Sequence, residues 1–194
     1  MQMMEKIRYT AAKWQALVLL VFGRRQAAML VFDRMISEFP SQEYAYASKA
    51  HILATMGQKT QAIEWLQKLT LLHSSNGHHW FNLGFLQEEN ADYDGALHSL
   101  TQATVHAPEL DRAWYGLGLV LIRHHRYDEA ITALKRNTQL QPMSPYGWYQ
   151  LARVHMDRQE PEEARKIIRH LKGFEPKVAA QLERETGIRL SPTS

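Results

Sequence analysis

The sequence predicts an all-α protein built from stacked pairs of helices. Three tryptophans, Trp80, Trp114 and Trp148, follow one another at intervals of 34 residues. Each is followed three residues later by Leu and then by Gly or Ala. A fixed interval of this length is the signature of a repeat architecture, in which each unit is one supersecondary element that stacks on its neighbours.

We number each unit from the residue three before its tryptophan, so that units start at 77, 111 and 145 and tryptophan is at position 4. Weaker units in the same register start at 43 and 9, and the first is degenerate because Ala12 stands at position 4. The later units also share Ala at position 20, Leu or Ile at 24 and Pro at 32, namely Ala96, Ala130, Ala164, Leu100, Leu134, Ile168, Pro108, Pro142 and Pro176.

The repeated positions describe two helices that cross closely. Positions 4, 7, 8 and 11 share one helix face. Large residues at 4 and 7 beside a small one at 8, together with Ala at 20, allow a second helix to approach. We therefore predict that Trp fills the space between helices. The recurring Pro is predicted to end the second helix, because the residue before Pro disfavours helical backbone.

The C-terminal tail predicts one more helix, over residues 177–187. Leu182 takes the place of the tryptophan, and Gly187 is a stop signal. We expect this helix to cap the last unit. The sequence thus predicts a single domain over 1–190, with repeats at 9–42, 43–76, 77–110, 111–144 and 145–178.

The pattern W-x2-L-G, A-x3-L/I and P at 34-residue intervals resembles the tetratricopeptide repeat (TPR) family. The segments AWYGLG (113–118) and YDEAI (127–131) carry the resemblance most clearly, and it covers nearly the whole chain. It implies a right-handed α-solenoid of about five helix-turn-helix repeats. It also implies a non-enzymatic adaptor, scaffold or co-chaperone that binds a peptide segment of another protein in its concave groove.

Composition excludes several other classes. The chain is 45% hydrophobic with a formal net charge of +3, which is ordinary for a folded protein and too mild to indicate nucleic acid. It has no cysteine, so disulfides and thiolate metal sites are excluded. The longest apolar run, 16–22, is far shorter than the roughly 20 residues of a membrane span. We expect a cytoplasmic protein without membrane insertion or a nucleic-acid partner.

The sequence contains no motif for catalysis or cofactor binding. Its ten histidines include neither H-x3-H nor H-E-x-x-H spacing. A nucleophile elbow and a phosphate-binding loop are also missing. We therefore expect no catalytic residue, no cofactor and no metal.

The resemblance places groove-facing residues at positions 2, 5, 6, 9, 12 and 13 of the first helix in each repeat. Aromatic side chains alternate there with Arg, His and amide groups, and exposed aromatic and Arg side chains are enriched in protein interfaces. Phe81 and Phe85 fit packing against the adjacent repeat equally well. The candidate groove residues are Tyr44, His51, His78, Phe81, Asn82, Phe85, Arg112, Tyr115, Leu119, Arg123, Tyr146, Tyr149, Gln150 and Arg153.

Two alternative functions remain open. The first repeat is apolar on more than one face through Trp14, Leu17, Val18 and Val21, so it must be buried in the array or against another chain. This pattern favours a self-assembling scaffold, a homo-oligomer. The second alternative is a chaperone of the kind that TPR proteins provide in secretion.

Overall fold

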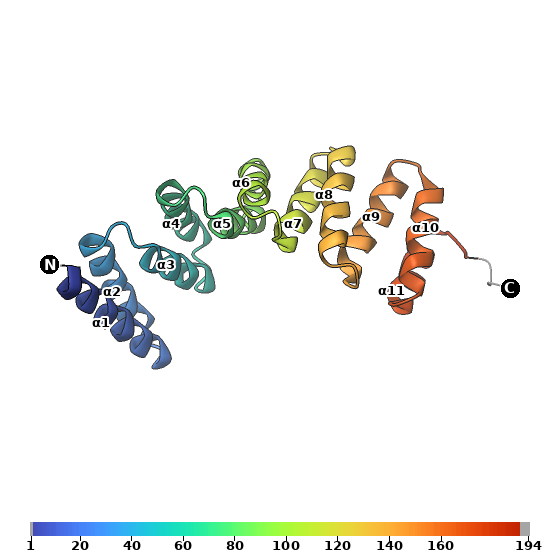
Figure 1. Ribbon diagram of the computed structural model, residues 1–194. Coiled ribbons are helices and arrows are strands. Elements are labelled where there is room, and N and C mark those ends of the chain that lie inside the picture. Colours follow the sequence, from blue (N-terminus) through green and yellow to red (C-terminus); the bar gives the residue numbers. More distant parts are fainter. Residues whose placement is uncertain (1, 191–194) are drawn as a thin grey trace.

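The computed structural model describes residues 2–190, which form eleven α-helices (Figure 1). Successive helices pair, and the pairs stack into an elongated array with the two ends of the chain at opposite ends. The predicted all-α solenoid is therefore confirmed. The helices are α1 (Gln2–Val21), α2 (Arg25–Glu38), α3 (Glu43–Thr55), α4 (Lys59–Leu72), α5 (Gly77–Glu89), α6 (Tyr93–His106), α7 (Asp111–Arg123), α8 (Tyr127–Leu140), α9 (Pro145–Asp157), α10 (Pro161–Lys172) and α11 (Pro176–Thr186).

Odd-numbered helices α1 to α9 are the first members of the pairs, and we call them the A helices; their even-numbered partners are the B helices. Helices α3, α5, α7 and α9 begin 34 residues apart and are all 13 residues long. Each B helix packs against its own A helix and against the helix that follows it, which is the next A helix or, for α10, the terminal helix α11. This arrangement buries a continuous core along the array.

The turn inside every pair contains a left-handed residue at position 15. The next residue donates its N–H to the carbonyl of position 11 at 2.8–2.9 Å, which satisfies the end of the A helix. Glycine adopts left-handed backbone at no steric cost, yet three of the five turns use other residues. The residues and their φ angles are Gly23 (70°), Gly57 (77°), Ala91 (61°), His125 (56°) and Gln159 (61°).

The tryptophans at position 4 are half-buried rather than wholly enclosed. They pack against the core, as predicted, and each also donates its Nε1–H to the backbone carbonyl six residues earlier. This bond fastens the turn that joins one repeat to the next. The pairs are Trp80 with Ser74 at 2.7 Å, Trp114 with Pro108 at 2.9 Å and Trp148 with Pro142 at 2.9 Å; Tyr46 makes the same contact to Pro40 through its hydroxyl at 3.2 Å.

Glycine at position 8 lets the B helix approach, as the sequence predicts. A Cβ atom on Gly118 would lie 2.7 Å from Cγ of Leu134, and one on Gly84 would lie 2.7 Å from Cγ of Leu100. Both leucines are buried and stand at position 24. A side chain added at Gly84 or Gly118 would therefore push the two helices of that repeat apart.

Two ends of the array differ from the expected register. Helix α1 begins at Gln2, seven residues before the start of the first unit at 9. Pro176 begins α11 instead of ending α10, which stops at Lys172 before Gly173. Proline suits this position because the first turn of a helix leaves its N–H groups unpaired. Gly187, with φ of 72°, follows the last residue of α11.

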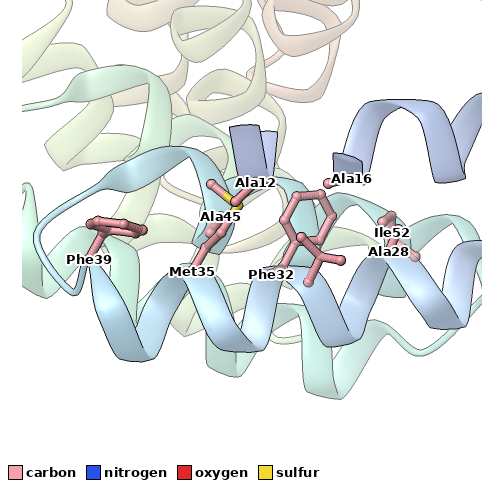
Figure 2. Packing of buried hydrophobic residues seen from close by; sticks show 9 residues of the cluster. Ala12, Ala16, Ala28, Phe32, Met35, Phe39, Ala45 and Ile52 are labelled. Carbon is pink, nitrogen blue, oxygen red and sulfur yellow. The ribbon is translucent and has the colours of Figure 1, made fainter. Parts of the chain in front are cut away.

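The first pair packs through small residues. Ala12 and Ala16 of α1 face Phe32 and Met35 of α2, and Ile52 joins them from α3 (Figure 2). Alanine at these positions lets the large side chains of α2 fill the space between the helices. The degenerate first repeat therefore keeps the pattern at positions 8, 20 and 24, with alanine in place of the large residue at position 4 and Phe32 at position 24.

Candidate binding groove

Positions 9 and 13 of the internal A helices line cavities on one face of the array. We call this face, formed by α3, α5, α7 and α9, the A-helix groove. Its cavities lie between successive A helices because these positions point toward the neighbouring repeat. The lining residues at the two positions are His51, Thr55, Phe85, Glu89, Leu119, Arg123, Arg153 and Asp157.

The first cavity lies between α3 and α5 and has a volume of about 390 Å³. Its floor is apolar, with Ala50, Leu66 and Leu86, and Phe85 stands at its side, half exposed. The cavity opens because Ala47 occupies position 5, where the next three repeats carry an aromatic ring. His51, Asn82 and Glu89 supply the polar rim.

The second cavity lies between α7 and α9, with a similar volume of about 390 Å³. Leu119, Ile122 and Val154 form its apolar part, while Arg123, Gln150, Arg153 and Asp157 surround the opening. Arg123 lies over the ring of Tyr93 at 4.8 Å and 3.4 Å from a carboxylate oxygen of Glu88. This part of the groove is thus more polar and richer in arginine than the first cavity.

The C-terminal end of the groove is closed by α11. Tyr149 donates its hydroxyl to Oε2 of Glu185 at 2.6 Å, beside a third cavity that Arg153 also lines. This hydrogen bond raises the pKa of Tyr149 and lowers the pKa of Glu185. The Tyr149 hydroxyl is therefore already bound within the folded chain, by a residue of α11.

Residues predicted at position 2 lie outside these three cavities. Tyr44 is half-buried with its ring edge-on to Phe32 and with Nζ of Lys13 4.3 Å from its centre. His78 and Tyr146 are exposed. Arg112 lies over the ring of Phe81 at 5.1 Å. Position 2 therefore forms the edge of the groove and not its floor.

Two of the three predicted aromatic residues at position 5 have a packing role in the central repeats. Phe81 packs against the core that contains Leu100, and Tyr115 packs against the core that contains Leu134. Phe85 differs from them because half of its surface is exposed in the first cavity. Of the two phenylalanines whose role the sequence left open, Phe81 therefore serves the core and Phe85 lines the cavity.

Two groove arginines have no acidic partner. Within residues 2–190, no carboxylate oxygen lies within salt-bridge distance of Arg112 or Arg153, whose nearest recorded partners are the rings of Phe81 and Tyr149. Arg123, by contrast, is paired with Glu88. Unpaired guanidinium groups on an open surface are available to a carboxylate of a ligand.

The two buried histidines, His79 and His155, are each paired with a carboxylate in the folded chain. Nε2 of His79 lies 2.8 Å from Glu43, and Nδ1 of His155 lies 2.7 Å from Glu160. In the part of the chain that the structure describes, no group of three or more His, Asp or Glu side chains is arranged to hold a metal ion. None of the helices over 2–190 has the length and apolarity needed to cross a membrane.

Family models agree with the geometry. Three models described as tetratricopeptide repeat match residues 43–75, 86–136 and 121–183. The chain belongs to the TPR family. Repeats of this family are generally non-enzymatic modules for binding other proteins or peptides. A comparison with curated proteins gave no match.

Solved structures share the same TPR fold over most of their length. A crystal structure of MamA protein is 19% identical with a TM-score of 0.76, over 95% of this chain and 98% of that one. YrrB, whose structure is described as that of a TPR protein with an unusual peptide-binding site, is 18% identical with a TM-score of 0.76, over 87% and 88%. PilF of Pseudomonas aeruginosa is 22% identical with a TM-score of 0.68, over 93% and 91%. These likenesses show the fold.

Proposed function

We propose that residues 1–190 act as one TPR adaptor domain that holds a peptide segment of a partner protein in the A-helix groove. The observation that carries this proposal is the series of cavities lined by positions 9 and 13 of successive A helices. Binding of proteins or peptides is the general activity of the family. The peptide-binding site named for YrrB, which shares the fold, also supports it.

The groove chemistry defines the segment that would fit. An apolar side chain of the peptide enters the first cavity, where Ala50, Leu66 and Leu86 remove it from water. One or more acidic side chains of the peptide lie at the α9 end of the groove, within reach of the unpaired Arg153. The ligand is therefore a segment with an apolar anchor followed or preceded by carboxylates, bound without any covalent step.

A displayed library of random peptides tests this function with the intact protein as bait. We expect enriched peptides to share one large apolar residue and at least one Asp or Glu. Arg153→Gln should weaken the enriched peptides by about tenfold, because a charge-assisted hydrogen bond is lost. Binding is measured by fluorescence anisotropy of the labelled peptides.

Arg169→Gln is the matched control, since Arg169 is exposed on α10 and lines none of the groove cavities described above. A second variant, Ala47→Phe, fills the first cavity with an aromatic ring like the one that the next three repeats carry at this position. It should abolish binding of the apolar anchor while retaining the fold. If Arg153→Gln and Ala47→Phe both bind as the parent does, the groove is not the binding site.

A further inference from the structure

Helix α1 has a continuous apolar face that no element within residues 2–190 covers. Trp14 is 63% exposed and Val18 is 51% exposed. The opposite face of α1, with Ala12 and Ala16, is buried against α2 (Figure 2). The exposed face follows the spacing of a single helix side over nearly the whole length of α1. We call it the α1 open face; it consists of Met3, Met4, Ile7, Trp14, Leu17, Val18, Val21 and Phe22.

The same face of the internal A helices is covered by the preceding B helix. Val120 and Val154, at position 10 of α7 and α9, are fully buried there, whereas Val18 occupies position 10 of α1. At position 3, Ala113 and Gly147 are buried, and the equivalent Ala11 is exposed. Helix α1 therefore retains the residue pattern of a helix–helix junction, a small residue at position 3 and an apolar one at 10. The shape that this pattern accepts is another helix.

The rim of the α1 open face is basic. Lys6, Arg24 and Arg25 are exposed, and within residues 2–190 no carboxylate lies within salt-bridge distance of them. The one acid of α1, Glu5, lines a cavity with Tyr9 and Phe39 on the side that faces the turn between α2 and α3. Lys6 borders that cavity too, and Arg8 of α1 is paired with Glu38 of α2 at 2.7 Å. A ligand at this face thus meets an excess of positive charge.

This charge distribution disfavours a second copy of the chain as the occupant. Two α1 helices packed face to face would bring the same lysines and arginines together without an acid to pair them, and like charges across an interface are costly. An anionic bilayer would match the charge, but a flat surface does not explain the small residue at position 3. A helix with acidic flanks satisfies both the shape and the charge.

We propose that the α1 open face binds an amphipathic helix of a partner protein whose apolar side is flanked by Asp and Glu. The helix takes the place that a B helix occupies at the internal junctions. The face is about 28 Å long from Met3 to Phe22 at 1.5 Å per residue, so it accepts a helix of up to about 20 residues. This surface is separate from the A-helix groove and does not depend on groove binding.

The test uses the full chain and two labelled synthetic helices of about 20 residues. Both have Leu on one face and Ala elsewhere; one carries Glu on the flanks of the Leu face and the other carries Lys. Fluorescence anisotropy measures binding to the parent, to Val18→Glu and to Val105→Glu. Val105 is the matched control, because it is 64% exposed on α6, away from α1.

We expect the Glu-flanked helix to bind the parent and Val105→Glu equally, and to bind Val18→Glu at least about tenfold more weakly. The Lys-flanked helix should bind the parent about tenfold more weakly than its Glu-flanked counterpart. Because Val18 is half exposed, Val18→Glu is expected to fold, which circular dichroism checks. Arg153→Gln should bind the Glu-flanked helix as the parent does, so failure of the groove proposal and failure of this one are distinguishable.

Three results would overturn the proposal. The first is that neither helix binds, or that both bind alike. The second is a concentration-dependent dimer in sedimentation velocity that Val18→Glu abolishes, which would assign the face to a second copy. The third is flotation with vesicles of phosphatidylcholine and phosphatidylglycerol that Val18→Glu abolishes, which would assign it to an anionic membrane surface.

Discussion

The two ends of this array differ in how their apolar residues are covered. At the C-terminal end, α11 places Ala179 and Leu182 against Ile168 and Leu171 of α10, and all four are buried. At the N-terminal end, α1 leaves a large apolar face exposed. The C-terminal end shows how a short helix with a polar outer side closes a solenoid. An exposed apolar face at the end of the array is therefore not a requirement of the fold.

Of the substitutions at the two ends, Leu182→Ala should have the largest effect on the free energy of unfolding. Leu182 is fully buried, so its truncation should lower the free energy of unfolding by about 3 kcal/mol through lost burial and a cavity. Trp14→Ala at the other end removes a larger side chain, yet it should change the free energy of unfolding by less than about 0.5 kcal/mol. Urea unfolding followed by circular dichroism measures both. Equal losses for the two variants would show that the N-terminal face is covered.

A smaller effect concerns the tryptophans inside and at the end of the array. Trp114→Phe keeps an aromatic ring but removes the Nε1–H bond to Pro108, so stability should fall by about 1 kcal/mol. Trp14, for which no such bond is recorded, is the control, and Trp14→Phe should unfold as the parent does. If the Trp114 variant also matched the parent, the indole bond would have no part in joining the repeats.

The five turns offer a third contrast, between the first two repeats and the last three. Ala91→Gly should raise the free energy of unfolding by about 0.5–1 kcal/mol, because glycine relieves the left-handed strain at a φ of 61°. Gly57→Ala should lower it by a similar amount, since the change is confined to the backbone: no atom lies within 4 Å of the added Cβ. Thermal unfolding of the two variants checks the opposite signs.

The smallest effect is on the pH dependence of the junction between α3 and α5. His79 binds the carboxylate of Glu43 at 2.8 Å, and this hydrogen bond is the main reason that the pKa of Glu43 lies below its ordinary value of 4.5. Folded Glu43 therefore binds fewer protons than unfolded Glu43. Its stabilisation is present above pH 4.5 and is lost as the pH falls through the lowered pKa.

Glu43→Gln should accordingly lose less stability than the parent between about pH 5 and pH 3. The effect is small because half of the Glu43 side chain is exposed to solvent. Urea unfolding at several pH values measures it. Parallel pH profiles for the two proteins would show that the pair with His79 makes no contribution.

The sequence predicts the helices well because the residues that pack between them follow a repeated pattern of large and small side chains. Trp114, Gly118 and Leu134 each report a contact between neighbouring helices, and 34-residue intervals place them in register. The left-handed turn residue is harder to predict, because Ala91, His125 and Gln159 share no side-chain property. Their conformation is imposed by the hydrogen bonds that close the A helices.

The groove could be predicted only in outline. The resemblance gives the helix positions that face it, but the cavities depend on which neighbours are small. Ala47 opens the first cavity. The floor of this cavity includes Leu66, which lies on the B helix α4, whereas all the predicted groove positions lie on A helices. Tyr149 shows the same limit, because its bond to Glu185 depends on where α11 begins. Pro176 starts that helix, whereas Pro108 and Pro142, at the same position of the repeat, follow the ends of α6 and α8.

The array is closed by α11 at its C-terminal end and leaves the α1 open face uncovered at its N-terminal end within residues 2–190. Hydroxyl-radical footprinting of the purified protein, read by mass spectrometry over a range of concentrations, tests it most directly. We predict rapid oxidation of Met3, Met4 and Trp14 at every concentration and strong protection of Met35, which is buried in the first pair. Protection of Trp14 equal to that of Met35 would contradict the claim, because the α1 open face would then be covered in the protein as it stands.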